Sequence, residues 1–339
     1  MKIKKSFAYV LFFGISVFLL YLTFKNTEFS KIQASVGSLH WEFVFACFAI
    51  TLGAHFLRAW RWKLLLEPMG YNARLRTSFY AVLIGYLTNY AIPRGGELAR
   101  CGVMFGTDKI PVDKLLGTVV TERIIDLLLL FVIFMVTLFL EFSTINDFLK
   151  LDQLWLLHHY FIYVLLAAGF SLLAFSLVFR KTIAQFKWVR KIIDFLKGFN
   201  EGLLSVFKVK NQPLFWIQSI GIWVGFFFIN YTFMHAMPMT ENLPAKVVLV
   251  VLAMGAVGFA IPTPGGAGSY HYIIKMTLVF YFIKAGVSDA DAESNAVAYA
   301  LVSHTAQAAF IALAGSISLY LAFIERKKVS YESSTTVTK

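Results

Sequence analysis

The sequence is poor in cysteine and in charge, and it lacks the short motifs of common enzymes. Its two cysteines, Cys47 and Cys101, fall in or beside apolar runs, and no CxxC pair or Cys/His cluster accompanies them. They therefore give neither a disulfide framework nor a zinc site. No Walker motif, GxSxG or HExxH is present, which excludes the sites that those motifs build. Charged residues make up 15% of the chain, and the stretches between apolar runs are too short for a soluble catalytic domain.

Apolar residues dominate instead. Of the 339 residues, 58% are hydrophobic and 17% aromatic, and the mean hydropathy is +0.69. These values are typical of a polytopic α-helical membrane protein. The net charge of +12 does not indicate nucleic acid, because membrane proteins concentrate Lys and Arg in their cytoplasmic loops. We expect membrane lipid as the partner, with no nucleic acid, cofactor or metal.

The apolar runs predict the membrane-spanning helices, each of which needs about 20 residues. They are Phe7–Phe24, Trp41–Leu66, Leu115–Leu140, Trp155–Phe179, Phe215–Ala236 and Ala296–Ile324. No small-residue cleavage site follows the first run, so we expect an uncleaved helix. Lys25–His40 is expected to be a polar loop. Helical spacing of apolar residues predicts an amphipathic helix at about 181–209 on the cytoplasmic surface. Residues 1–328 then form one membrane domain, followed by a disordered tail at 329–339.

Two short breaks interrupt the apolar sequence and are near-copies of each other, AIPRGG at 91–96 and AIPTPGG at 260–266. Proline blocks helix continuation, and glycine allows backbone geometries closed to other residues. Each break lies between two short apolar arms, so we predict re-entrant helical hairpins at 77–106 and 246–283. Such a break is tolerated in a membrane only where it is buried in protein or lines a wet cavity. The breaking residues are Pro93, Gly95, Gly96, Pro262, Pro264, Gly265 and Gly266. Two packed kinks are the alternative to a functional cavity.

The basic residues predict the topology. With the N-terminus in the cytoplasm and each hairpin returning to its side of entry, 24 of the 31 Lys and Arg are cytoplasmic, as expected for a cytoplasmic (inner) membrane protein. The C-terminus is then cytoplasmic too. The halves at about 41–140 and 212–324 acquire opposite orientations. The predicted fold class is therefore an all-α polytopic membrane protein with an inverted-topology repeat, an architecture of alternating-access transporters.

The sharpest polar signal is Glu122, Arg123 and Asp126 inside the run at 115–140. At about 1.5 Å per residue, Asp126 lies roughly 16 Å from the start of that helix, about half-way through the bilayer. A charge at the centre of a lone helix costs about 2.5–3.5 kcal/mol, so these side chains are not expected to face lipid. They line a wet cavity, or they form a structural ion-pair network between this helix and the first hairpin.

Further candidates flank the two breaks. Arg94, Glu97 and Arg100 flank the first break. Glu97 and Arg100 are expected to pair with each other or with Arg123 and Glu122. Exposed amides at the start of the following arm would suit an anion, and an interfacial salt-bridge cluster is the alternative. The candidates of the second half are Ser269, His271, His304 and Gln307. By contrast, Arg58 and Arg61, which flank Trp60, indicate an interfacial anchor.

Four ordered motifs resemble the lysylphosphatidylglycerol synthase transmembrane-domain family, also called the flippase-like membrane domain family. They are RAWRW at 58–62, AIPRGGE at 91–97, TERIID at 121–126 and PTPGGAG at 262–268. The resemblance covers residues 5–325 and implies lipid handling, since the domain is associated with flipping aminoacylated phosphatidylglycerol. The chain lacks the soluble aminoacyl-transferase domain of those proteins, so lipid lysylation is not expected.

We therefore predict a lipid transporter of flippase type rather than an enzyme. A central cavity at the two breaks would bind the polar or anionic headgroup of a phospholipid or glycolipid while the acyl chains stay in the membrane. Arg94, Arg100 and Arg123 would attract phosphate, and Glu122 and Asp126 would contact a cationic group or carry a coupling proton. The alternatives are a membrane-embedded transferase acting on a lipid-linked substrate and a scaffold for a separate lipid synthase or glycosyltransferase.

Overall fold

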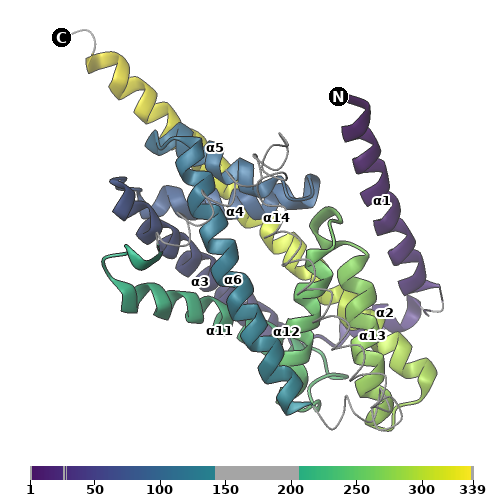
Figure 1. The fold of residues 1–339 in the computed structure, drawn as a ribbon. Coiled ribbons are helices and arrows are strands. Elements are labelled where there is room, and N and C mark those ends of the chain that lie inside the picture. The colour runs from purple at the N-terminus through teal and green to yellow at the C-terminus, as the bar shows by residue number, and fades with distance from the viewer. Residues whose placement is uncertain (1, 26, 28, 142–205, 337–339) are drawn as a thin grey trace, which may run out of the picture.

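The computed structural model describes residues 2–25, 27, 29–141 and 206–336, and every regular element in them is helical (Figure 1). The N-terminal part holds α1 (Lys2–Phe24), α2 (Phe29–Gly37), α3 (Trp41–Leu66), the short 3-10 helix η1 (Glu67–Met69), α4 (Leu75–Ala91), α5 (Gly96–Asp108) and α6 (Val112–Leu140). The C-terminal part holds α11 (Gln212–Ala236), α12 (Ala245–Ala260), η2 (Pro264–Gly266), α13 (Ser269–Lys284) and α14 (Asp289–Thr336). The all-helical prediction is confirmed for this part of the chain.

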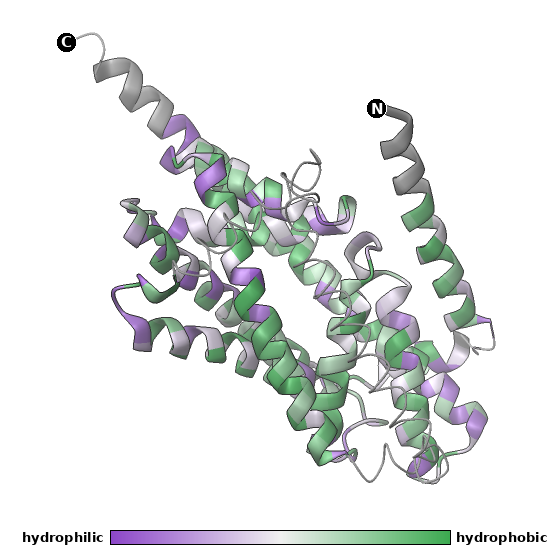
Figure 2. Ribbon diagram, viewed as in Figure 1, coloured by the Kyte–Doolittle hydropathy of each residue, from purple (hydrophilic) through white to green (hydrophobic). Residues whose placement is uncertain are grey.

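Four of the described helical segments are long and apolar enough to cross a membrane. They are Trp41–Met69, Val112–Leu140, Gln212–Ala236 and Asp289–Lys328, and Figure 2 shows them mainly in the hydrophobic colour with hydrophilic patches between. They correspond to four of the predicted spans. The predicted span at 155–179 and nearly all of the amphipathic helix at 181–209 lie outside the described residues.

The two sequence breaks each turn a helical hairpin. In the first hairpin, α4 and α5 run antiparallel, since Gly85 meets Gly96 near the turn and Arg74 meets Asp108 at the open end. The contact at Gly96 requires glycine, because a Cβ there would lie 2.1 Å from the carbonyl oxygen of Gly85. In the second hairpin, α12 and α13 pack together beside their turn. The predicted arms match the helix bounds to within about two residues.

Helix α14 runs alongside both hairpins and shows how they are arranged. Its Glu293 lies 3.3 Å from Lys275 of α13, its His304 contacts the second break at Gly265, and its Glu325 binds Arg74 at the open end of the first hairpin. The stretch from Glu293 to Glu325 is about 48 Å long at 1.5 Å per residue. The open ends of the hairpins therefore lie toward opposite ends of α14, and their turns meet between.

The start of α1 and the end of α14 lie on the same side of the molecule (Figure 1). Two local expectations differ from the structure. The predicted polar loop at 25–40 contains α2, because Ile32 packs with Phe233 and Val297 in a buried apolar cluster. The tail expected to be disordered from Val329 is helical as far as Thr336, since continuing an existing helix adds one hydrogen bond for each residue fixed.

Candidate functional site

The carboxylates of α6 lie in a buried ion cluster with arginines from two other helices. Arg58 and Arg61 of α3 reach Asp126 at 2.8 and 2.7 Å. Glu122 pairs with Arg100 of α5 and lies 3.6 Å from Arg61. A buried charge is costly unless it is paired, so these contacts fix α3, α5 and α6 to one another. The contacts form an ion-pair network that joins α6 to α3 and to the first hairpin.

Helical spacing aims the side chains at one another. Glu122 and Asp126 are four residues apart on α6, and Arg58 and Arg61 are three apart on α3, so each pair shares a face of its helix. Trp62 completes the α3 side, where its ring lies 4.4 Å from the Arg100 guanidinium. The Trp62 indole N–H donates to Thr118 Oγ1 at 2.8 Å. The cluster therefore joins aromatic packing to charge pairing.

The expectation that the segment around Arg58 and Arg61 anchors α3 in the membrane interface is wrong. Both arginines and Trp62 are buried, with exposed fractions of 2%, 0% and 0%. The three-residue spacing of the arginines, matched to the four-residue spacing of the two acids, was the sequence signal for this partnership. Arginine beside tryptophan at a helix end is also the usual pattern of an interfacial anchor, so the sequence pattern alone favours the wrong interpretation.

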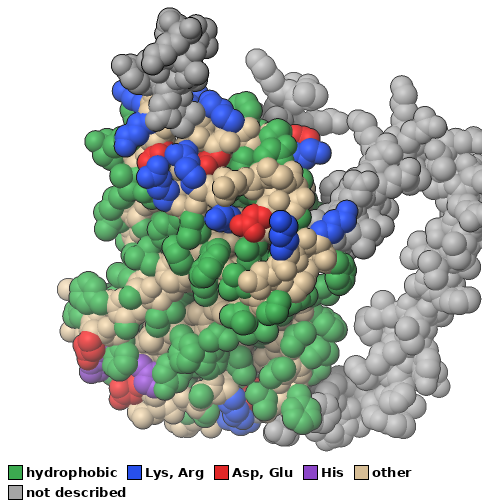
Figure 3. All heavy atoms as spheres, turned by 90° about the vertical axis from the view of Figure 1, so that its left-hand side faces the viewer, with side chains coloured by type: hydrophobic (Ala, Val, Ile, Leu, Met, Phe, Trp, Pro, Cys, Tyr) green, Lys and Arg blue, Asp and Glu red, His purple; other side chains and the backbone are tan. Residues whose placement is uncertain are grey.

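An outer edge of the cluster remains accessible. Arg123 lies 3.4 Å from Glu97 and 3.9 Å from Asp126, and its side chain is 44% exposed. Of the two pairings that the sequence left open, the structure has Glu97 with Arg123 and Arg100 with Glu122, rather than Glu97 with Arg100. Figure 3 shows a short row of basic and acidic side chains across the middle of one face, above a broad apolar region. Three buried arginines face two buried carboxylates here, so positive charge is in excess.

The two breaks meet each other beside this edge. Arg94, in the first turn, is exposed, and its guanidinium donates to the carbonyl oxygen of Ala260 at 2.9 Å. Gly265 of the second turn has φ +56 and lies so close to Tyr90 that a Cβ would sit 2.3 Å from its ring. Glycine is required there by both the backbone and the contact. The turns of the two hairpins therefore meet in one junction.

The second break is held by neutral hydrogen bonds. Ser269 Oγ, fully buried, donates to the carbonyl oxygen of Gly258 at 2.8 Å and lies 2.7 Å from the Thr263 hydroxyl. His271 Nδ1 accepts the backbone N–H of Gly268 at 3.2 Å, and His304 Nε2 lies 2.9 Å from the Gly265 carbonyl oxygen. The structure brings these three candidates together at the break. Gln307 instead faces α3, where its side-chain nitrogen lies 3.1 Å from Cys47 Sγ.

The sequence matches a known protein family over most of its length. The model of the family described as "Lysylphosphatidylglycerol synthase TM region" matches residues 9–315. The chain belongs to this family. It is also similar to a UPF0104 membrane protein of Methanocaldococcus jannaschii, with 26% identity over 186 residues. That match covers 53% of this chain and 54% of the relative, so the chain spans about half the length of the curated relative that it matches. No solved structure gives a significant match.

This member of the lysylphosphatidylglycerol synthase transmembrane family also has an ion cluster at the open end of its first hairpin. Arg74 contacts Asp108 at 2.9 Å and Glu325 at 3.0 Å, and Arg76 contacts Glu325 at 3.1 Å. Burial alone would raise the pKa of Asp108. Hydrogen bonds from Arg74 and Thr107 outweigh that effect, so the pKa of this carboxyl lies below its usual value. The cluster fastens the end of α14 to the hairpin.

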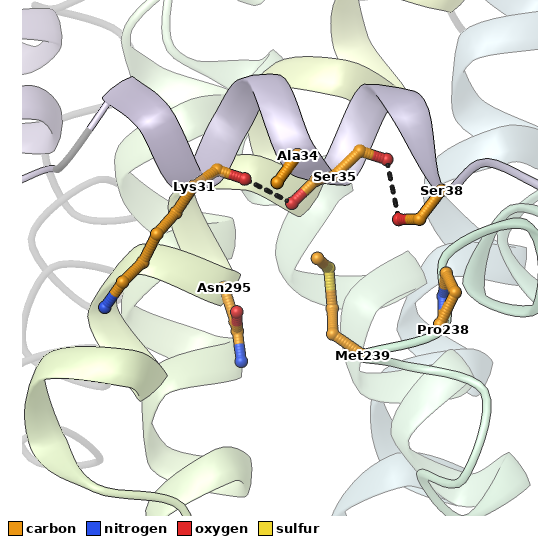
Figure 4. Close-up of a pocket in the computed structure, with 7 residues that line it drawn as sticks. All are labelled: Lys31, Ala34, Ser35, Ser38, Pro238, Met239 and Asn295. Atoms are coloured by element: carbon orange, nitrogen blue, oxygen red, sulfur yellow. Dashed lines mark hydrogen bonds between the residues drawn. The ribbon is translucent and has the colours of Figure 1, made fainter.

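A small open pocket lies away from these sites, where α2 faces the start of α14 (Figure 4). Its lining comprises Lys31, Ala34, Ser35, Ser38, Pro238, Met239 and Asn295. Lys31 pairs with Asp291 at 2.8 Å, and the pocket contains none of the residues predicted to carry function. In the part of the chain that the structure describes, no group of three or more His, Cys, Asp and Glu side chains is placed to hold a metal ion.

Proposed function

We propose that this family member is a lipid transporter of flippase type, which moves a phospholipid or glycolipid with a polar or anionic headgroup across the cytoplasmic membrane. The observation that carries the proposal is the meeting of two broken hairpins beside an accessible charged edge. Broken helices that meet near the middle of a membrane are the usual setting of a transporter's substrate site. Membership of a family named for a lipid-modifying protein supports a lipid as the cargo.

In this proposal the exposed arginines meet the headgroup. Arg94 and Arg123 attract the phosphate or another anionic group, and Glu97 between α5 and α6 contacts a cationic group. The acyl chains remain in the membrane along the apolar surface. Arg100, Glu122 and Asp126 act one layer further in, where they hold the edge in position. Ser269, His271, His304 and Gln307 shape the second hairpin and its packing against α3 and α14.

The proposed topology places each hairpin as a re-entrant segment from one side of the membrane. The excess of Lys and Arg then lies in the cytoplasm together with both chain ends. The common side on which α1 begins and α14 ends supports this orientation, and so does the end-to-end order of the hairpins along α14. Two oppositely oriented hairpins with touching turns could open toward one side at a time, which is the requirement for alternating access.

The test is lipid exchange between leaflets of vesicles that contain the purified protein and fluorescent phosphatidylglycerol. We expect exchange that Arg123→Gln and Arg94→Gln each slow by about tenfold or more, a loss of about 1.4 kcal/mol. Lys114→Gln is the matched control, since Lys114 is also exposed on α6 but lies over two turns from Arg123. It should exchange lipid at the parent rate.

Three other outcomes would overturn the proposed function or the proposed headgroup site. A new lipid product without leaflet exchange would indicate the membrane-embedded transferase. Neither exchange nor product, with a range of labelled phospholipids and glycolipids, would favour a scaffold for a separate synthase. Exchange that is unchanged in both arginine variants would keep the flippase but place its headgroup site elsewhere.

A further inference from the structure

Two histidines face each other inside the junction of the hairpins. The ring centroids of His271 on α13 and His304 on α14 are 4.6 Å apart, with an interplanar angle of 61°. Both are buried, with exposed fractions of 4% and 7%. Tyr90 of the first hairpin lies 6.0 Å from the His304 ring, and Tyr270 lies 5.3 Å from it. The pair therefore sits where α4, α13 and α14 converge.

The backbone partners of the two rings indicate which ring nitrogens carry a hydrogen. His271 Nδ1 accepts the N–H of Gly268, so this nitrogen carries a lone pair and the ring is neutral. His304 Nε2 faces the carbonyl oxygen of Gly265, which can only accept, so this nitrogen carries a hydrogen. Both bonds hold residues of the second turn itself. The neutral form of His271 is consequently part of what keeps that turn closed.

Protonation would work against this arrangement. A proton on His271 Nδ1 would point at the N–H of Gly268, which removes the hydrogen bond and sets two donors against each other. It would also add positive charge in the first turn of α13, where the helix dipole disfavours a cation. Protonated His304 would keep its bond to Gly265, but its charge would lie beside the other ring. The first effect breaks the bond between His271 and the turn, and when both rings are protonated their charges repel each other across the junction.

The surrounding groups do not offset such a charge. Lys275, one turn beyond His271, is buried and already paired with Glu293, and Arg94 brings a further positive charge to the Ala260 carbonyl. Tyr90 and Tyr270 are uncharged near neutral pH. Ring contacts also join His271 to Phe24 of α1 and His304 to Phe259 of α12, and neither of these side chains titrates. Neither ring has a carboxylate partner among the described residues.

We propose that His271 and His304 form a proton-binding site, and that protonation releases the turn of the second hairpin from the first. Resting on the proposed function, this makes the proton the coupling ion of lipid transport. The packed junction is the unprotonated state, and the separated junction is the protonated one. Two protons enter the site when the turn opens and leave it when the turn closes.

The size of the effect follows from ordinary histidine chemistry. A histidine exposed to water titrates with a pKa of about 6.5. If the packed state does not bind the proton and the open state does so with that pKa, a change from about pH 8 to about pH 5 favours the open state by about 30-fold for each histidine. Acid therefore opens the junction, and neutral or basic pH closes it.

The test measures the junction directly and does not depend on transport. Nitroxide spin labels are attached to Ile92→Cys and Ala260→Cys, two exposed positions on opposite sides of the junction. The native cysteines are fully buried and do not compete for the label. Dipolar broadening in the electron paramagnetic resonance spectrum is compared at about pH 8 and about pH 5, on either side of the ordinary histidine pKa. The protein is held in nanodiscs of phosphatidylglycerol and phosphatidylcholine.

The two histidine variants keep the hydrogen bond that each ring makes and remove the group that binds the proton. His271→Asn leaves an acceptor where Nδ1 stood, and His304→Gln leaves a donor where Nε2 stood. The matched control is His235→Asn on α11, a histidine whose Nδ1 lies 2.9 Å from a backbone carbonyl oxygen four residues earlier. Each single variant keeps one of the two histidines, so its opening equilibrium should change with pH by the factor expected for one histidine. Either single variant therefore tests the proposal if the double variant does not fold.

We expect broadening at about pH 8 that is lost at about pH 5 in the parent and in His235→Asn, and retained at both values in the double variant. A parent spectrum that does not change with pH would overturn the proposal, as would an unchanged pH response in the double variant. Lipid exchange on the same preparations separates the two proposals. A junction that responds to pH in a protein that exchanges no lipid supports the proton site and overturns the flippase.

Discussion

The two hairpin turns share a sequence pattern and differ in chemistry. Around the first turn the side chains are charged, with Arg94 exposed, Glu97 half-buried and Arg100 buried against Glu122. Around the second turn they are neutral, and Ser269, Thr263 and His271 bind one another or the backbone. A Pro-Gly break sets the course of the backbone in both places, but it does not determine what the turn can bind.

The difference also shows how each turn is stabilised. The first hairpin depends on partners from helices outside it. Glu122 of α6 pairs with Arg100 of the hairpin, and Asp126 of α6 pairs with the arginines of α3. The second hairpin satisfies most of its polar groups within itself. Charge removal should therefore damage the first region more than hydroxyl removal damages the second. Four substitutions test this contrast, beginning with the largest expected effect.

Asp126→Asn should reduce the free energy of unfolding by about 3–5 kcal/mol, because it leaves Arg58 and Arg61 buried without their closest carboxylate. Thermal unfolding in detergent measures the change. Asp113→Asn, an exposed site on the same helix, is the control and should be near neutral. A near-native melting temperature for Asp126→Asn combined with loss of lipid exchange would contradict the structural reading and return Asp126 to a direct role in transport.

Gly96→Ala should destabilise the first hairpin by about 1–3 kcal/mol or more, as overpacking does. The new Cβ would lie 2.1 Å from a backbone oxygen that cannot turn aside. Gly265→Ala should also destabilise the protein, because its φ of +56 is strained for alanine and its Cβ would meet the Tyr90 ring. Gly102→Ala on α5 has no neighbouring atom within 4 Å and should be neutral or stabilising by up to about 1 kcal/mol. Equal melting temperatures for Gly96→Ala and Gly102→Ala would refute the close contact of α4 and α5.

Ser269→Ala should cost about 1–3 kcal/mol, because it leaves the buried carbonyl oxygen of Gly258 without its donor. Thr277→Val on the same helix removes a hydroxyl that bonds only to the preceding turn, and its effect should stay within about 0.5 kcal/mol. Chemical denaturation of both variants gives the comparison. If Ser269→Ala costs as much as Asp126→Asn, the proposed contrast between the two regions fails.

Asp108→Asn should have the smallest effect, and that effect should depend on pH. The pKa of Asp108 is lowered in the folded protein, so its contribution is present above its ordinary pKa of about 3.9 and is lost as the pH falls through the lower folded value. The melting temperatures of parent and variant should therefore differ near neutral pH and converge in acid. Curves that stay parallel down to about pH 3 would show that Arg74 does not stabilise this carboxylate.

Much of the fold could be predicted from the sequence because its signals are local. Long apolar runs give α3, α6, α11 and α14, and the Pro-Gly segments give the two turns where the structure has them. The pairing of the charges on α6 could be predicted for the same reason, since a charge within an apolar run is costly unless it has a partner. Helix α2 could not, because its stability comes from packing against α11 and α14 rather than from its own residues.

Proline, glycine and hydrophobic length act within a few residues, so they are enough to predict a helical membrane protein with two proline-glycine turns. Which charges pair, and the contact between the two turns, depend on segments that are far apart in the chain. Arg58 and Asp126 are 68 residues apart, and Arg94 and Ala260 are 166 apart. Helical spacing can place side chains on a common face, but the partner of that face depends on how the helices pack.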